Sequence, residues 1–293
     1  MYDLLQHIYV DAIIQKSRKT DESAALTSMV DRSEAKNVLL LADRGYEAYN
    51  NLAHIQEKGW SFLIRIKDSS AGIASGLNLP RSNTFDIPFH LKLTNKQTNE
   101  VKCLLLDKNH YKRIPSKCRF DYLPAKSRKS DPTQFFDLHF RIVRFPISAT
   151  ACETIITNLD NDAFPIQEIK HLYAMRWGIE TSFRELKYSV TLLHLHSKKV
   201  GFIYQEVFAK LIMYNFCQII TQSVVIRQGK KKHAYKVSFS DAVHVCLRFF
   251  RGKISPPDVE ALLMRYISPI CPGRMLSRKF SPKSSVSFAY RVS

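Results

Sequence analysis

The sequence predicts an α/β fold built on a largely buried sheet, and two observations support that class. Residues 38–42 (Val-Leu-Leu-Leu-Ala) form an uninterrupted apolar run of strand length, which is typical of a strand buried on both faces. Stretches with strand and helix character alternate around this run over residues 8–66. A strand, helix, strand, helix, strand order indicates an α/β core.

Local signals define the elements of this first part. The expected elements are a strand at 8–14, a helix at 22–31, the strand at 38–42, a helix at 46–58 and a strand at 61–66. Thr20 or Asp21 can cap the first helix, and Gly59 can end the second. We take residues 1–67 as the N-terminal part of a core domain.

From residue 68 the pattern changes to short alternating stretches, with Ser, Gly, Asn and Pro between them. Expected strands lie at 89–94, 101–106 and 136–145, and a basic loop lies at 124–132. This pattern predicts a β-rich, mostly antiparallel insertion over 68–150.

The core is expected to resume over 151–225. A strand at 154–158 is followed by one long helix that Asn161 or Asp162 and Pro165 open, and a further helix covers 203–223. Residues 226–293 form a basic C-terminal region with little pattern.

The charge balance favours a polyanionic partner. Lys and Arg number 44 against 26 acids, so the formal net charge is +18, and residues 227–293 hold 14 Lys and Arg but only three acids. Such an excess favours nucleic acid first and an anionic membrane second. No stretch resembles a spanning helix or a signal peptide, and the six scattered cysteines have no zinc-like spacing. We therefore expect a soluble, intracellular protein with reduced thiols that faces DNA or RNA.

Residues 173–187 place one carboxylate among cations and aromatic rings. On a single helix, at about 100° per residue, one strip holds or borders Tyr173, Arg176, Trp177, Glu180, Arg184 and Lys187. Charged residues at such spacing ordinarily make only a solvated helix face. A second feature elsewhere in the chain, independent of this helix, is therefore needed before these residues indicate a functional site.

Asp43 supplies that feature, because it stands where the buried strand at 38–42 ends. A carboxylate there is costly unless it is paired or binds a cation, although it can also simply cap the turn into the next helix. Asp43 and Glu180 together could hold Mg²⁺, a hard cation that prefers oxygen ligands, or two ions about 3.5–4 Å apart. The neighbouring cations would then neutralise phosphates, and Trp177 could stack on a splayed base.

These residues resemble a known family. The spacing Tyr173-x₂-Arg176-x₃-Glu180-x₆-Lys187 reproduces the Y-x₂-R-x₃-E-x₆-K signature of the IS4-type DDE transposases. The segment Asp43-Arg-Gly-Tyr46 is similar to the one that bears their second catalytic aspartate, and that family also has a β-rich insertion between this aspartate and the glutamate. The resemblance covers roughly residues 1–220.

The resemblance implies an RNase H-like mixed sheet flanked by helices and interrupted by the insertion. It implies cleavage at transposon ends and transfer of the 3′-OH into target DNA, with Mg²⁺ or Mn²⁺ held by Asp43 and Glu180. By this resemblance, double-stranded transposon-end DNA is contacted by Tyr173, Arg176 and Lys187, and a flipped base by Trp177. We extend the DNA contacts to Arg184 because of its position beside the strip. A bacterial cytoplasmic protein that works as a homodimer on paired ends, without a membrane partner, is the corresponding expectation.

One departure from the family concerns its first catalytic aspartate, which lies on an early strand in an Asp-Gly-Ser context. Asp3 and Asp11 are the only early candidates, and neither fits that context. We therefore expect a chain that begins inside the catalytic core and has no transposition activity by itself. The alternatives are a non-catalytic DNA-binding remnant and an RNase H-like nuclease; the nuclease is disfavoured because cations and aromatic rings around Glu180 suit end binding better than general hydrolysis.

Overall fold

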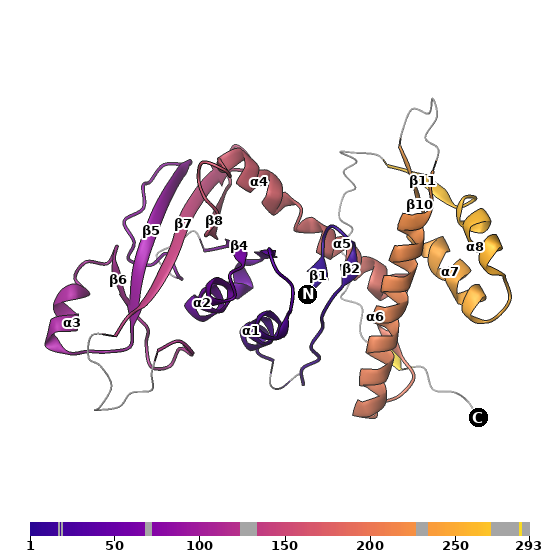
Figure 1. The fold of residues 1–293 in the computed structure, drawn as a ribbon, viewed down its shortest axis with the longest axis horizontal. Coiled ribbons are helices and arrows are strands. Elements are labelled where there is room, and N and C mark those ends of the chain that lie inside the picture. The colour runs from indigo at the N-terminus through magenta and orange to yellow at the C-terminus, as the bar shows by residue number, and fades with distance from the viewer. Residues whose placement is uncertain are drawn as a thin grey trace. The chain divides into compact units, whose positions relative to one another are not determined.

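The computed structural model describes residues 1–16, 18, 20–67, 72–123, 134–226, 234–270 and 287–288 (Figure 1). The expected basic loop at 124–132 lies outside these residues. The chain divides into two compact units. The first, Gln15–Arg176, is called the sheet unit; the second combines Met1–Ile14 with Trp177–Ser293 and is called the helical unit.

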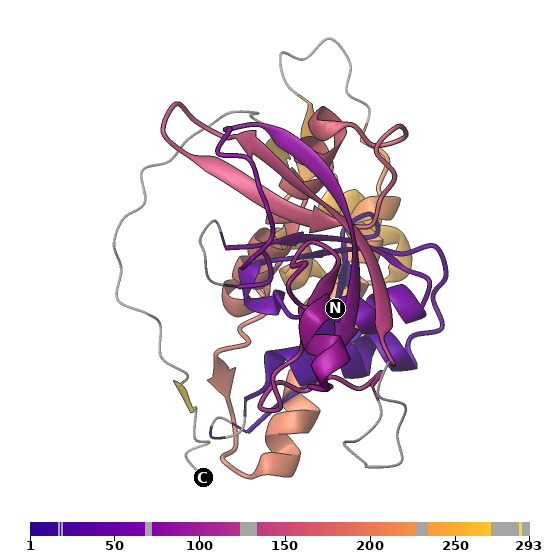
Figure 2. The same cartoon turned by 90° about the vertical axis from the view of Figure 1, so that its left-hand side faces the viewer.

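The sheet unit is built on one six-stranded mixed sheet in the order β3-β4-β8-β7-β5-β6. Its strands are β3 (Leu39–Ala42), β4 (Ser61–Arg65), β5 (Phe85–Thr94), β6 (Tyr111–Arg113), β7 (Phe136–Pro146) and β8 (Cys152–Thr157). The outer pairs β3–β4 and β5–β6 are parallel, whereas the three central pairings are antiparallel. Figure 2 shows the long strands β5 and β7 side by side.

Helices cover both faces of this sheet. The helices of the unit are α1 (Glu22–Arg32), α2 (Tyr49–Glu57), α3 (Asn99–Leu104) and α4 (Ile166–Ala174), with a 3₁₀ turn, η2, at Arg44–Tyr46. Helix α4 packs through Ile169 against a buried cluster that includes Leu63 of β4 and Ile155 of β8. Helices α1 and α2 lie on the other side of the sheet (Figure 1). Phe62, Leu63 and Ile64 of β4 are therefore fully buried. The apolar run at 38–42, expected to be buried on both faces, instead forms β3 at the edge of the described sheet, where buried and half-buried residues alternate.

The structure confirms most of the expected core elements. The strands at 38–42, 61–66 and 154–158 and the helix at 22–31 are present within two residues of their expected bounds. Asp21 rather than Thr20 caps α1, since its side chain accepts a hydrogen bond from the Ala24 backbone. The expected helix at 46–58 begins later, at Tyr49, because residues 44–46 form the 3₁₀ turn.

Two expected strands are wrong. Residues 101–104 belong to helix α3 and 105–106 to the turn after it. The Thr98 side chain caps this helix by accepting a hydrogen bond from Val101 N at 3.3 Å. The strand expected at 8–14 is reduced to β2 (Ile8–Tyr9), which pairs with β1 (Tyr2–Asp3) as a short hairpin of the helical unit. Asp11 follows that hairpin and is no part of the six-stranded sheet.

The strands expected in the insertion continue the same sheet, because β7 pairs with β8 along the whole of β8. They are thus not a separate sheet in this structure. The insertion at 68–150 and the domain boundaries at residues 67, 150 and 225 stay predictions.

A buried arginine joins the centre of the sheet to the loop that leads into α4. Arg141 of β7 is 4% exposed and pairs with Asp86 of β5. Its Nε donates to Leu159 O at 2.7 Å, and its Nη2 donates to Phe164 O at 2.6 Å and Asp160 O at 3.2 Å. Because a buried charge is tolerated only when it is paired and hydrogen-bonded, this set of acceptors fixes the loop before α4.

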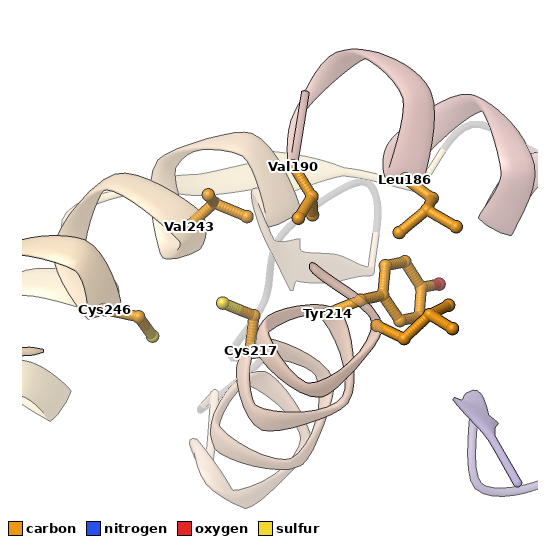
Figure 3. Close-up of a cluster of buried hydrophobic side chains, with 7 residues drawn as sticks. Leu186, Val190, Tyr214, Cys217, Val243 and Cys246 are labelled. Carbon is orange, nitrogen blue, oxygen red and sulfur yellow. The ribbon is translucent and has the colours of Figure 1, made fainter. Parts of the chain in front are cut away.

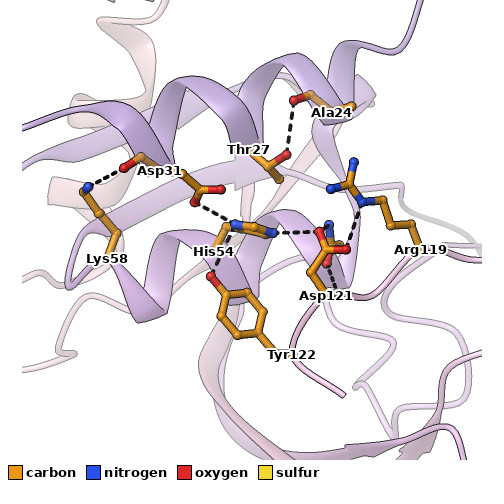
Figure 4. A network of polar contacts seen from close by, with 9 residues as sticks. Ala24, Thr27, Asp31, His54, Lys58, Arg119, Asp121 and Tyr122 are labelled. Atoms are coloured by element: carbon orange, nitrogen blue, oxygen red, sulfur yellow. Dashed lines mark hydrogen bonds and ion pairs between the residues drawn. The ribbon is translucent and has the colours of Figure 1, made fainter. Parts of the chain in front are cut away.

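A second polar network holds α1 and α2 together (Figure 4). His54 of α2 contacts Asp31 of α1 through Nδ1 at 2.7 Å and Asp121 through Nε2 at 3.0 Å. Arg119 Nε donates to Asp121 at 2.9 Å. Although partial burial acts in the opposite direction, hydrogen bonds from Arg119, Asn50 and His54 hold the pKa of Asp121 at about 2. The network fixes α2, which follows directly on the turn at Asp43.

The helical unit is organised around one long helix, α6 (Val200–Ser223), close to the helix expected at 203–223. Its other elements are α5 (Trp177–Tyr188), α7 (Phe239–Phe250), α8 (Pro256–Leu263), β9 (His194–Leu195), β10 (Tyr235–Val237), β11 (Ile267–Pro269) and β12 (Ser287–Phe288). The N-terminal hairpin is held on α6 because the Asn215 side chain exchanges two 2.8 Å hydrogen bonds with the Tyr9 backbone. Ordered elements after residue 226 were not expected from the sequence.

The core of this unit lies between α5, α6 and α7 (Figure 3). It contains Leu186 and Val190, which follow one face of α5 and the turn after it, together with Leu211, Tyr214, Cys217, Val243 and Cys246. The five cysteines in the described part of the chain are free thiols, as expected. None of the described helices combines the length and apolar character needed to cross a membrane.

We predict that Arg141→Met lowers the free energy of unfolding by about 3–5 kcal/mol, because Asp86 then remains as a largely buried charge without its partner. Urea unfolding followed by circular dichroism measures the change. Arg81→Met, at an exposed loop position, is the control and should change stability by less than about 0.5 kcal/mol. Equal stability of Arg141→Met and wild type would show that Arg141 does not fix the loop before α4.

Candidate functional site

The candidate site begins where strand β3 ends. Asp43 directly follows β3 and caps the 3₁₀ turn, with its Oδ1 accepting a hydrogen bond from Arg44 N at 2.7 Å. Its side chain is 51% exposed, so the carboxylate stays accessible at the edge of the sheet. Both functions that the sequence allowed for Asp43, a turn cap and an exposed carboxylate at a strand end, are therefore present together.

Tyr173 and Arg176 meet Asp43 at this edge. The Tyr173 ring is 4% exposed, and its hydroxyl donates to the backbone oxygen of Ala42 at 3.4 Å. The Arg176 guanidinium lies 5.6 Å from the centre of that ring, and its Nη1 is 4.0 Å from Asp43 Oδ2. Burial is the main reason why the pKa of Tyr173 is raised to about 12. Tyr173 thus stays a neutral hydrogen-bond donor beneath the arginine.

A further ion pair at the same edge was missed in the sequence. Arg65 at the end of β4 lies 3.4 Å from Glu153 near the start of β8, and both residues contribute to the electrostatic environment of Tyr173. β4 and β8 are antiparallel, so the end of one and the start of the other share an edge. Only the strand order reveals this, and no local signal in the sequence marks Glu153.

The single helix expected to carry the whole signature is wrong. Helix α4 ends at Ala174, and α5 begins at Trp177. Between them, Met175 N donates to Leu172 O and Arg176 N donates to Tyr173 O. These bonds span three residues instead of the four of an α-helix, so the chain tightens and the helix axis is interrupted. Tyr173 and Arg176 consequently belong to the sheet unit, whereas the remaining signature residues belong to the helical unit.

Helix α5 presents those remaining residues on its exposed side. Glu180, Arg184 and Lys187 are all exposed and fall within about 60° of one another around the helix axis. We call them the α5 strip. Ser182 and Leu186 are buried on the opposite side of the helix. Trp177, at the first position of α5, is 55% exposed, so its large ring is accessible for stacking.

The donors at these positions suit a hard divalent cation. Asp43 and Glu180 are both exposed carboxylates, the ligand class that Mg²⁺ and Mn²⁺ prefer. Within the described part of the chain, no three His, Cys, Asp or Glu side chains gather closely enough to hold a metal ion. The donor chemistry of the two predicted ligands fits the metal, and the structure shows no preassembled cluster around either of them.

Over residues 1–216 the chain matches the transposase DDE domain, and it belongs to that family. This match covers all seven predicted site residues.

The chain is also 27% identical to the transposase InsG for insertion sequence element IS4 from Escherichia coli strain K12. The aligned 128 residues are 42% of this chain and 28% of that relative, so the match spans less than a third of the relative's length. Together the two comparisons confirm the IS4-type DDE transposase assignment that the signature predicted.

Proposed function

We propose that this chain binds transposon-end DNA and takes part in metal-dependent strand cleavage and transfer at those ends. The observation that carries the proposal is the Asp43, Tyr173 and Arg176 group at the end of β3, in a chain that also holds Glu180 and Lys187 at the family spacing. The excess of 44 Lys and Arg over 26 acids supports DNA as the polyanion.

We also propose that the six-stranded sheet and its helices form an RNase H-like core. A mixed six-stranded sheet with helices on both sides agrees with an RNase H-like core, and the central placement of β4 and β8 agrees with continuous burial on both faces. In such a core, Asp43 would be the second acidic residue of the family and Glu180 the third.

Asp43 and Glu180 are proposed as the ligands of Mg²⁺ or Mn²⁺. When bound, such an ion polarises the scissile phosphodiester and lowers the pKa of an attacking water. The chain's own cations act on the DNA directly, because a guanidinium or ammonium neutralises phosphate oxygens. Arg176 has this role beside Asp43, and Arg184 and Lys187 have it on α5.

The two aromatic signature residues differ in exposure, and we propose different roles for them. Tyr173 is buried, so it contributes to DNA binding mainly by holding Arg176 against Asp43. Trp177 is exposed, so its ring can stack on an unpaired base, an interaction worth about 1–3 kcal/mol.

We further propose that the 293-residue chain by itself does not cleave DNA, since only two of the three family carboxylates are identified in it. Asp3, one of the two early candidates, accepts hydrogen bonds from Leu5 N and Gln6 N at 2.8 and 2.9 Å and so caps a turn. With fewer carboxylate ligands the metal is held less tightly. The chain is then an incomplete copy of the transposase that binds DNA without cleaving it by itself. A homodimer on paired ends in the bacterial cytoplasm remains the expected setting.

Incubation of the purified chain with Mn²⁺ and a labelled duplex carrying the ends of its own element tests the proposed inactivity. We expect no strand cleavage from wild type or from Glu180→Gln. Cleavage by wild type that disappears in Glu180→Gln would contradict the inactivity and assign Glu180 a catalytic role. Cleavage that persists in Glu180→Gln points to a different nuclease centre.

We predict that Lys187→Ala weakens binding of the same duplex several-fold and reduces the slope of log affinity against log salt by about one, the loss of one phosphate contact. Fluorescence anisotropy over a series of salt concentrations measures both quantities. Lys102→Ala is the matched control, because Lys102 is an exposed lysine on α3 and is not one of the predicted site residues. An unchanged slope in Lys187→Ala removes Lys187 from the contacts.

A further inference from the structure

A polar cavity lies beside the α5 strip, inside the helical unit. Its volume is about 360 Å³, it is open to solvent, and it is lined by α5, the turn after α5, β10, β11 and the start of α7. The cationic and hydroxyl groups around it come from Arg184, Tyr188, Ser189, Lys236, Ser240 and Ser268. Half of these residues lie beyond residue 216, where the family match ends.

The cavity carries an excess of positive charge. Arg184 and Lys236 are exposed cations, and no ion pair within 4.0 Å involves either of them across the residues that the structure describes. Glu185 is the one carboxylate among the residues lining the cavity. Its Oε2 accepts hydrogen bonds from Tyr214 at 3.0 Å and Gln218 at 3.2 Å.

Burial is the main reason why the pKa of Glu185 is raised, and Lys236 and Arg184 act in the opposite direction. The half-buried carboxyl group is hydrogen-bonded to Tyr214 and Gln218 of α6 in the core of the helical unit. Even with Glu185 fully charged, two cations face one acid. The balance around the cavity therefore favours an anionic ligand.

Hydroxyl groups add hydrogen-bond donors suited to phosphate oxygens. Ser189 Oγ and Ser240 Oγ lie 2.8 Å apart, which brings the turn after α5 together with the first turn of α7. The Tyr188 ring is 61% exposed at the border of the cavity. Cations, hydroxyls and an accessible aromatic ring together match the phosphate, sugar and base of a nucleotide.

The cavity is continuous with the α5 strip through Arg184. This residue lies one helical turn, about 6 Å along the axis, beyond Glu180. A second cavity, of about 380 Å³, shares Glu185 and Lys236 with the first and extends alongside α5 as far as Gly178. Ser182 lines the second cavity, which therefore lies on the side of α5 opposite the strip. The first cavity is the one that borders the strip, and we call it the groove; Lys236 stands where the two cavities meet.

We propose that this groove binds backbone phosphate of the DNA strand that lies along α5, with Lys236 and Arg184 as the cationic contacts. Lys236 is a binding residue that the transposase signature does not contain. The proposal rests on the proposed DNA-binding function, and it extends the DNA contact from the signature helix to β10 and α7.

The test compares Lys236→Ala with Arg248→Ala, an exposed cation on α7 that does not line the cavity. Anisotropy titrations with a labelled duplex should show Lys236→Ala binding several-fold more weakly, with a salt slope reduced by about one. Arg248→Ala should bind as wild type. Thermal unfolding checks that both variants fold, which is expected because Lys236 is exposed.

A second readout uses wild-type protein and needs no variant. Lysine acetylation by an amine-reactive ester, followed by peptide mass spectrometry, should show Lys236 protected when the duplex is bound. Lys102 on α3 serves as the unprotected reference. Sodium phosphate at the same total phosphate concentration should leave Lys236 reactive, because a single free phosphate lacks the neighbouring contacts of a strand.

Each result bears on the proposal in a defined way. If Lys236→Ala binds as wild type and Lys236 is acetylated equally with and without DNA, the groove does not bind DNA. If Lys187→Ala nevertheless weakens binding in the same assay, the proposed DNA-binding function still holds without the groove. Protection by free phosphate alone would overturn the DNA assignment in favour of a small phosphate ligand, and a chain that binds no duplex at all overturns both the groove and the proposed function.

Discussion

The arrangement of the sheet unit depends on the burial of one charged side chain, Arg141. Its guanidinium lies in the middle of the sheet, where it pairs with Asp86 and donates hydrogen bonds to backbone oxygens of the loop at 159–164. A buried guanidinium must have its donors satisfied, so the loop can adopt few other positions. Helix α4 leaves this loop and packs Ile169 on the sheet. That packing is what brings Tyr173 under Arg176 and both of them to Asp43.

The signature is continuous in sequence, but its residues are divided between the sheet unit and the helical unit. The turn at residues 175–176 ends one helix and starts another, so Tyr173 and Arg176 act with the end of β3, while Glu180, Arg184 and Lys187 are carried by a helix whose buried side belongs to the core of α6 and α7. The same helix borders the polar groove that contains Lys236. The residues of α5 therefore connect the family signature to a part of the chain outside the family match.

Much of the sheet unit could be predicted from the sequence, because a buried strand needs an apolar run and Asp43 marks where that run stops. The helix break could not be predicted, because the backbone bonds at Met175 and Arg176 that span three residues instead of four leave no compositional sign. Nothing in the local sequence distinguishes Arg141 from an exposed strand cation, since its acceptors come from segments 18 to 55 residues away. Glu153 and Arg65 come together only through the strand order.

The C-terminal helices were missed for a different reason. Residues 227–293 carry a large excess of Lys and Arg as a whole, whereas α7 contains one Arg and α8 contains no Lys or Arg. The overall charge therefore masks the helical spacing of Val243 and Cys246 on α7. Pro256 at the first turn of α8 is the local feature of the sequence that favours a helix start there.

The central claim is that Asp43 and Glu180 hold the divalent metal, and cleavage of the polypeptide by bound iron tests it most directly. Fe²⁺ substituted for Mg²⁺, with ascorbate and peroxide, generates radicals that cut the chain next to the metal ligands. We expect cuts near residues 43 and 180 that Mn²⁺ suppresses and that Glu180→Gln and Asp43→Asn each reduce. Cuts that are absent from both places, or that neither substitution changes, would contradict the assignment of these two carboxylates as metal ligands.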